Sequence, residues 1–189
     1  MSGFCPHGWN QSKIMALVCA ALFAAAGCSN SLKPTNAKLE KGLNLYFADH
    51  DECLFPKGIR FPYEVSPGKG SREQEKRMDA MKDAGLLKEL KDLTLHVERY
   101  TLTPLGERAA PRFCYGHRVV MSVDSFTPPV KQGNVMESTV TFHSTMTEVP
   151  LWVKTNAMKA AFPEMAQNIS GPTPGQMVMG TAGVGWRVR

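Results

Sequence analysis

The segment "NVMESTVTFHSTMTEV", residues 134–149, decides the fold class. Its apolar and polar side chains alternate, which is the pattern of a β-strand that buries one face. The face predicted to be buried carries Met136, Val140, Phe142 and Met146, and the opposite face carries Glu137, Thr139, Thr141 and His143. The sequence therefore predicts one long strand with a face turned toward a core.

Further strands are predicted on both sides of this segment. "RVVMSVDSF", residues 118–126, is rich in β-branched residues and stops before Pro128. We expect these two strands to pair as an antiparallel hairpin around "TPPVKQGN", residues 127–134. Two short strands are predicted around Gly180 to Gly183, and a short extended piece is predicted over residues 61–65.

Helical patterns precede and follow the predicted hairpin. The clearest helix is predicted over residues 72–84, because Ser71 and Gln74 match a capping box and Gly85 can end the last turn. A short amphipathic helix is predicted over residues 37–48. Another is predicted after Trp152, with a kink or new start at Pro163. The predicted class is α+β, an antiparallel sheet with three or four helices.

"ERYTLTPLGERAA", residues 98–110, has the features of a helix start, with Thr103 as N-cap and Pro104 at the first helical position. Together with the helix before it, the run 72–110 resembles the end of a winged-helix domain. That resemblance implies a helix, a two-stranded wing and a second helix. DNA binding is not expected, because no basic helix carries Arg, Asn or Gln arrayed for base edges. The 22 Lys and Arg are also spread along the chain, with a net charge of +5.

The N-terminus has the order of a secretory signal. A polar start with Lys13 precedes the apolar run "IMALVCAALFAAA", residues 14–26. Thirteen helical residues span roughly 20 Å, which is short of the roughly 30 Å hydrocarbon core, so a signal peptide is favoured over a transmembrane helix. We therefore expect residues 1–27 to be a signal peptide.

The residues that end this run resemble a bacterial lipobox. Ala25, Ala26, Gly27 and Cys28 match its small residues and its cysteine, although Ala25 stands where the pattern usually has Leu. The resemblance implies that Cys28 gains a diacylglyceryl group, becomes the N-terminus after cleavage and is acylated there. Several acyl chains would anchor the protein to a membrane without spanning it.

The chain after Cys28 predicts an address and a domain plan. Residues 28–38 read as a lipidated polar tether, and residues 39–189 as a single periplasmic domain. In lipoproteins of enteric-type bacteria an Asp after the cysteine retains the protein in the inner membrane, and this chain has Ser29. The expected location is the outer membrane, facing the periplasm, rather than the inner membrane.

The cysteines fit an oxidising compartment. Cys5 and Cys19 would leave with the signal peptide and Cys28 would be lipidated, so Cys53 and Cys114 remain. We predict a disulfide between them, with a buried sulfur at Cys114. A metal-binding or nucleophilic thiol is the alternative, but no C-x-x-C motif or convincing His partner is present.

No residue set in the sequence predicts catalysis. The run Asp49, His50, Asp51 and Glu52 invites a metal interpretation, but adjacent residues point in different directions, so a solvated turn is favoured. His96, His117 and His143 are scattered on predicted strands, and no G-x-S-x-G, H-E-x-x-H or P-loop motif occurs. We expect no catalytic residue, no metal and no other cofactor.

The mature sequence also has a wider resemblance. "FCYGHRVV", "VDSFTPP", "PLWVKTNAMKAAFP" and the final "GW" resemble a group of small uncharacterised envelope lipoproteins of proteobacteria. The resemblance to that group implies no biochemical activity and no catalytic residues. Two roles stay open: a structural or protein-interaction role, and a small-ligand-binding or hydrolytic domain with a pocket near Trp152 and Tyr115. A cavity with convergent polar groups would favour the second role, and a flat surface with an exposed apolar patch the first.

Overall fold

The computed structural model describes residues 33–66, 68, 70–92, 94, 96–183 and 185–189. The chain divides into two units, Met1–Lys33 and Pro34–Arg189, and the description below concerns the second. The predicted signal peptide, the lipobox and the first part of the tether lie outside the described residues. Pro34–Arg189 contains two hydrophobic cores and one disulfide of its own, so it can be studied as a separate domain.

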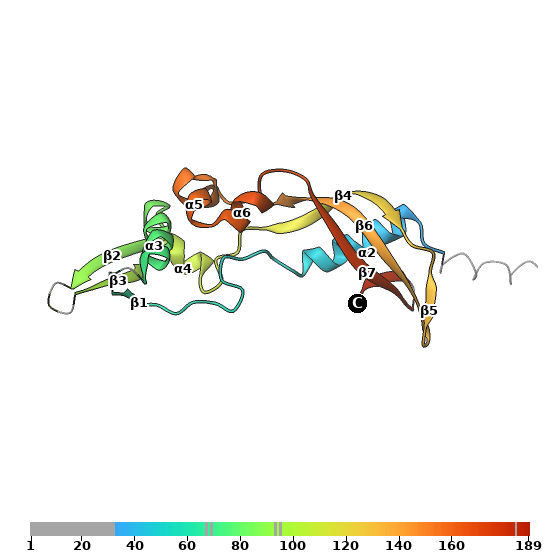
Figure 1. The fold of residues 1–189 in the computed structure, drawn as a ribbon, viewed down its shortest axis with the longest axis horizontal. Coiled ribbons are helices and arrows are strands. Elements are labelled where there is room, and N and C mark those ends of the chain that lie inside the picture. Colours follow the sequence, from blue (N-terminus) through green and yellow to red (C-terminus); the bar gives the residue numbers. More distant parts are fainter. Residues whose placement is uncertain (1–32, 67, 69, 93, 95, 184) are drawn as a thin grey trace, which may run out of the picture. The chain divides into compact units, whose positions relative to one another are not determined.

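The larger sheet has five strands and is antiparallel throughout. The order β4 (His117–Phe126), β6 (Val135–Thr147), β7 (Thr173–Ala182) and β8 (Gly185–Val188) confirms the predicted hairpin between the first two (Figure 1). The short β5 (Val130–Gln132) lies inside the hairpin loop and pairs with β6. The expectation of two short strands around Gly180 to Gly183 was wrong for the first of them. Strand β7 has ten residues, because it pairs with β6 from Thr173 to Gly180.

Helix α2 (Asn36–Ala48) packs between the two outer strands of this sheet. The Asn44 side chain accepts a hydrogen bond from the Val120 amide of β4 (2.8 Å), and the Asn36 side chain donates one to the Val123 carbonyl (3.2 Å). At β8, a Cβ added at Gly42 would fall on the Trp186 carbonyl oxygen. The helix therefore covers the β4 edge, which would otherwise present free backbone groups.

The smaller sheet contains a two-stranded hairpin that lies between two helices along the chain. Strands β2 (Leu87–Asp92) and β3 (Val97–Leu102) lie between α3 (Arg72–Asp83) and α4 (Pro104–Ala109). Strand β1 (Tyr63–Val65) precedes α3 and pairs with the other side of β3. Gly85 has φ +77° and ends α3, and the Leu86 amide donates to the Met81 carbonyl. The winged-helix resemblance itself stays a prediction.

The two helix starts in this region differ. The Thr103 hydroxyl accepts from the Gly106 amide at 3.0 Å, as expected of an N-cap. The capping box at Ser71 was wrong: Ser71 has αR backbone angles and its side chain makes no cap hydrogen bond. Its hydroxyl instead lies within hydrogen-bonding distance of the Ser66 and Gly68 carbonyls and of the Glu75 carboxylate, to one of which it can donate.

The C-terminal helical region is broken into short pieces. A 3₁₀ turn η2 (Leu151–Lys154) is followed by α5 (Asn156–Ala161) and α6 (Pro163–Asn168). Pro163 starts α6 because it has no amide to continue α5, which confirms the predicted break. The described residues consequently contain five α-helices, more than the three or four expected.

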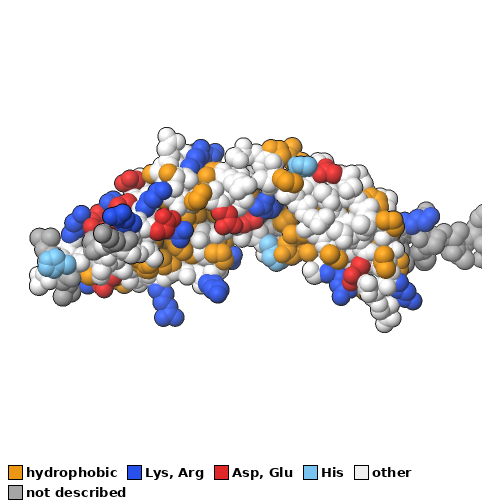
Figure 2. All heavy atoms as spheres, viewed as in Figure 1, with side chains coloured by type: hydrophobic (Ala, Val, Ile, Leu, Met, Phe, Trp, Pro, Cys, Tyr) orange, Lys and Arg blue, Asp and Glu red, His pale blue; other side chains and the backbone are white. Residues whose placement is uncertain are grey.

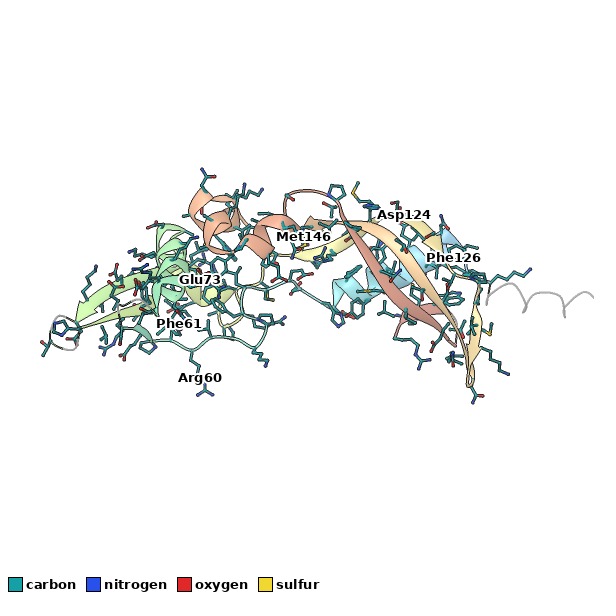
Figure 3. All side chains as sticks on the ribbon, viewed as in Figure 1. Arg60, Phe61, Glu73, Asp124, Phe126 and Met146 are labelled. Atoms are coloured by element: carbon teal, nitrogen blue, oxygen red, sulfur yellow. A yellow bond between two sulfur atoms is a disulfide. The ribbon has the colours of Figure 1, made fainter. Side chains whose placement is uncertain are left out.

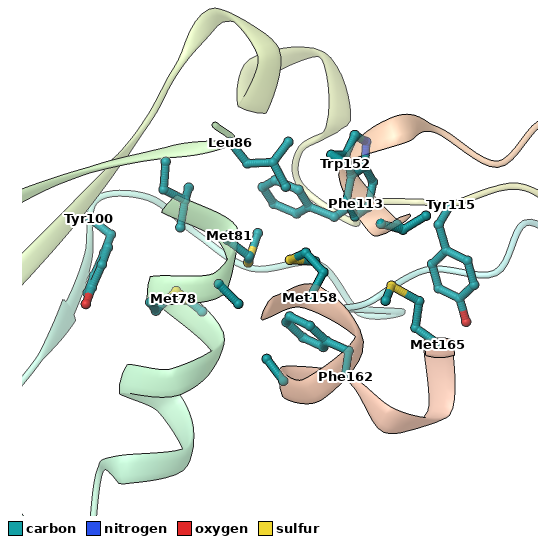
Figure 4. Packing of buried hydrophobic residues seen from close by; sticks show 14 of the residues in the cluster. Met78, Met81, Leu86, Tyr100, Phe113, Tyr115, Trp152, Met158, Phe162 and Met165 are labelled. Carbon is teal, nitrogen blue, oxygen red and sulfur yellow. The ribbon is translucent and has the colours of Figure 1, made fainter. Parts of the chain in front are cut away.

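Two separate cores hold these elements. The first joins α3, α5, α6 and the small sheet, where Met78 and Met81 face Met158 and Phe162 (Figure 4). The second joins α2 to the five-stranded sheet through Leu39, Leu43, Phe47, Val140, Phe142 and Trp186. The long strands connect them, since Phe126 of β4 packs against the second core and Met146 of β6 against the first (Figure 3).

The surface carries both signs of charge. Lysine, arginine, aspartate and glutamate side chains are interspersed over the face in Figure 2. No helix within the described part of the chain is long and apolar enough to span a membrane.

Candidate functional site

A cavity of about 580 Å³ opens beside the second core, with Phe47 and Phe142 of that core in its lining. Its walls come from the end of α2, the loop 49–52, strands β4 and β6, helix α6 and the first half of β7. Polar and apolar groups both line it. The cavity is therefore of the size usual for small-molecule sites, with side chains from distant parts of the sequence.

Arg118 of β4 organises the polar side of this cavity. Its Nε lies 2.7 Å from Glu52 Oε1, in the loop after α2. Its Nη1 donates to the Thr173 hydroxyl of β7 at 2.7 Å, and its Nη2 donates to the Asn168 side chain of α6 at 2.9 Å. One guanidinium thus fixes three segments around the cavity by charge-assisted hydrogen bonds.

A second layer of contacts positions Asn168. Its Nδ2 donates to the Tyr115 hydroxyl oxygen at 3.0 Å. Burial raises the pKa of the Tyr115 phenol above its ordinary value. Asn168 therefore links the buried Tyr115 to Arg118 in one network.

Aromatic rings form the apolar side of the cavity. Phe47 of α2 and Phe142 of β6 are 4% and 2% exposed and meet edge to face, with ring centroids 5.8 Å apart. Gly175 of β7 lies opposite Phe142, and a Cβ there would come within 2.6 Å of the Phe142 ring. A residue without a side chain at 175 is what leaves room for this ring.

Ser144 is the polar residue on the buried face of β6 that lines the cavity. It is 1% exposed, and its hydroxyl makes no hydrogen bond to any other residue that the structure describes. Ser138 on the same face is also buried, but its hydroxyl donates to the Thr127 carbonyl at 2.7 Å. The Ser144 hydroxyl is therefore available at the cavity wall for a hydrogen bond to water or to a ligand.

The acidic run after α2 forms one rim of the cavity. His50 stacks on Tyr46 with ring centroids 3.8 Å apart, and its Nδ1 donates to the Tyr46 carbonyl. Asp51 is exposed, and its Oδ1 lies 4.0 Å from the Nδ1 atom of His117. The predicted solvated turn is present at Asp49, and His50 and Asp51 after it are exposed as well, whereas Glu52 is partly buried and pairs with Arg118. Across the described residues no group of three His, Cys, Asp or Glu side chains is placed to hold a metal ion.

The predicted disulfide lies next to this rim and is confirmed. Cys53 and Cys114 are joined, with Cα atoms 3.8 Å apart. The Glu52 amide donates to the Gly116 carbonyl and the Tyr115 amide to the Glu52 carbonyl, both at 2.8 Å. The expectation of a buried Cys114 was wrong, since both cysteines are only half-buried. The bridge fixes Glu52 and Tyr115 relative to each other.

A Ser, Asp and His cluster on the outer face of the sheet does not form a nucleophile site. His143 Nδ1 lies 2.6 Å from Asp124 Oδ2, and Asp124 Oδ1 accepts from the Ser122 hydroxyl at 2.8 Å. The Ser122 hydrogen bond, followed by His143, lowers the pKa of Asp124. A serine nucleophile must donate to the imidazole, and Ser122 donates to the carboxylate instead.

The cavity differs from the one expected near Trp152 and Tyr115. Trp152 is buried in the first core, and Tyr115 reaches the cavity only through Asn168. The roles of Arg118 and Asn168 were missed. One sequence signal was available: Ser144 falls on the apolar face of the long strand, where a polar residue needs an explanation.

Comparisons with known proteins add no assignment. No family model, no curated protein and no solved structure matches this chain.

Proposed function

We propose that this protein is a lipid-anchored protein of the bacterial envelope whose domain binds a small molecule in the Arg118 cavity. The observation that carries the binding role is the cavity itself, about 580 Å³ lined by both aromatic and polar side chains. Buried Ser144 supports it, because its hydroxyl has no hydrogen-bond partner in the described chain. Polar side chains that converge beside aromatic ones in one cavity are typical of ligand sites.

The envelope address is supported by residues 14–28. Their apolar run and the order Ala25, Ala26, Gly27 and Cys28 resemble a lipoprotein signal. The Cys53–Cys114 disulfide fits an oxidising compartment such as the periplasm. We propose attachment through acyl chains on Cys28, at the periplasmic face of the outer membrane.

A structural or protein-interaction role is the second candidate. The observation that favours it is the exposure of Leu90, Met121 and Leu151, which are 61%, 59% and 80% exposed. These side chains come from β2, β4 and η2, three elements that are not neighbours in either sheet. Single exposed apolar residues are common on protein surfaces, so the cavity carries more weight.

Nucleic acid is not proposed as a partner. Helix α3, the helix that precedes the wing-like hairpin, carries Arg72, Lys76, Arg77 and Lys82 together with Glu73, Glu75, Asp79 and Asp83. Its formal charges cancel, and its Arg77 and Lys82 are paired with Glu73 and Asp79 of the same helix. A helix that binds DNA needs Lys or Arg side chains that are free to contact the phosphates.

The binding role can be tested by covering the mouth of the cavity. Gln167 of α6 is exposed and lines the cavity, so Gln167→Trp places a large ring over the opening. Ala160→Trp on exposed α5 is the matched control outside it. We expect compounds from a mixed-charge library to raise the melting temperature of residues 29–189 and of the control, but not of Gln167→Trp. A library without a hit, or equal shifts for both variants, would contradict the proposal.

A further inference from the structure

We infer that the ligand of the Arg118 cavity is a small aliphatic amine that carries more than one ammonium group. This inference rests on the proposed function and adds the chemical class of the ligand. It follows from which charges around the cavity are already balanced and which are not.

The positive charge of the cavity is already compensated. Arg118 pairs with Glu52 at 2.7 Å, and two further N–H groups are committed to Thr173 and Asn168. A guanidinium offers five N–H donors, so two remain, but its charge is balanced by the carboxylate. An anionic ligand would have to compete with Glu52.

The negative charge of the cavity is in excess. Asp51 and Glu164 also line it. Among the described residues, the Asp51 carboxylate has one basic side chain within 4.0 Å, that of His117, and Glu164 forms no ion pair. These two carboxylates come from different elements, the loop after α2 and helix α6. A ligand with two separated positive charges can approach both.

The neutral polar groups offer further acceptors. The Ser144 hydroxyl oxygen has free lone pairs in a residue that is 1% exposed. His50 uses Nδ1 as a donor to the Tyr46 carbonyl, which leaves Nε2 as an acceptor in the neutral ring. An ammonium group has three donors and no acceptor, so it complements this set.

The aromatic side of the cavity is the reason for proposing an aliphatic segment in the ligand. Phe47 and Phe142 lie in the second core with one ring against the other, and both line the cavity. Phe47 is 4% and Phe142 2% exposed, so the aliphatic part of the ligand would meet only the small exposed fraction of these rings. A polyamine combines methylene segments with several ammonium groups.

Spermidine is a suitable probe, titrated calorimetrically into residues 29–189 at low salt. We expect saturable binding that weakens about fivefold in Asp51→Asn and in Glu164→Gln, and about 25-fold in the double variant, the range given by exposed ion pairs. Glu107→Gln, which removes an exposed carboxylate on α4 away from the cavity, should leave the affinity unchanged. Rising salt should weaken the wild type more than the double variant.

Several results would overturn the inference. The inference is wrong if spermidine does not bind, or if it binds the double variant as tightly as the wild type. A neutral or anionic compound whose binding is lost in Gln167→Trp while spermidine fails would refute the ligand class and leave the binding role standing. If no compound of any charge binds, both the ligand class and the proposed function are wrong.

Discussion

Arg118 Nε lies 2.7 Å from Glu52 Oε1, and this contact joins β4 to the loop after α2 across a separation of 66 residues. The two side chains are 20% and 33% exposed. Partly buried pairs of this kind are fixed by geometry as well as charge. Through this contact and that with Asn168, Arg118 holds the loop after α2 and helix α6, two walls of the cavity, to β4.

Glu52→Gln should therefore destabilise the domain by about 1–2 kcal/mol, because it leaves the half-buried Arg118 without its counter-ion. Urea unfolding at neutral pH measures the change. Glu64→Gln is the control, since the carboxylate that pairs with Arg99 is 51% exposed and its loss should cost under about 1 kcal/mol. Equal losses of unfolding free energy in the two variants would mean that the Glu52–Arg118 pair stabilises the domain no more than an exposed ion pair does.

Removal of the disulfide should cost more. The bridge closes a sequence separation of 61, for which the chain-entropy model gives about 4 kcal/mol. Cys53→Ser combined with Cys114→Ser should lower the free energy of unfolding by up to that amount. Intact mass after alkylation checks the bridge itself: two alkylated thiols without reductant would show that it is not formed.

Gly42→Ala tests the contact between α2 and β8. Alanine would normally favour a helix over glycine by about 1 kcal/mol, but here its Cβ would fall on the Trp186 carbonyl. We expect a net loss of about 2 kcal/mol in urea unfolding. Gly185→Ala in β8 has no atom within 4 Å of the added Cβ and should be close to neutral. A stabilising Gly42→Ala would refute this packing.

Glu89 should contribute to the acid sensitivity of the domain. Its hydrogen bond from Lys82, followed by that from Lys91, lowers the pKa of Glu89 below its ordinary 4.5. A carboxylate with a depressed folded pKa stabilises fully above its unfolded pKa and loses this effect as pH falls through the folded value. Stability should therefore drop below about pH 4.5, and Glu89→Gln should flatten that drop. Glu107→Gln should not, and equal slopes would contradict the assignment.

Local patterns predicted most elements of this fold. The alternation along residues 134–149 predicted β6. On the face expected to be buried, Val140 and Phe142 are indeed buried. Thr103 with Pro104 gave the start of α4. These features depend on neighbours along the chain, so their physical signal is contained in a short window.

Long-range relationships could not be read in the same way. Arg118 meets Glu52, Asn168 and Thr173 only after three segments have folded together, and no spacing in the sequence encodes that meeting. The length of β7 depends on its register with β6 rather than on its own glycine-rich pattern. The Cys53–Cys114 pairing could be predicted from the sequence, because these are the two cysteines that follow Cys28.

The assignment of the protein to the cell envelope depends on one residue, Cys28. Cells that express the full chain can be fed a labelled fatty acid, and label on the protein can be compared between the wild type, Cys28→Ser and the control Cys19→Ser. We expect label on the wild type and none on Cys28→Ser, which should also accumulate as the uncleaved precursor. The control should be labelled normally. Label on Cys28→Ser at the wild-type level would contradict the lipid anchor.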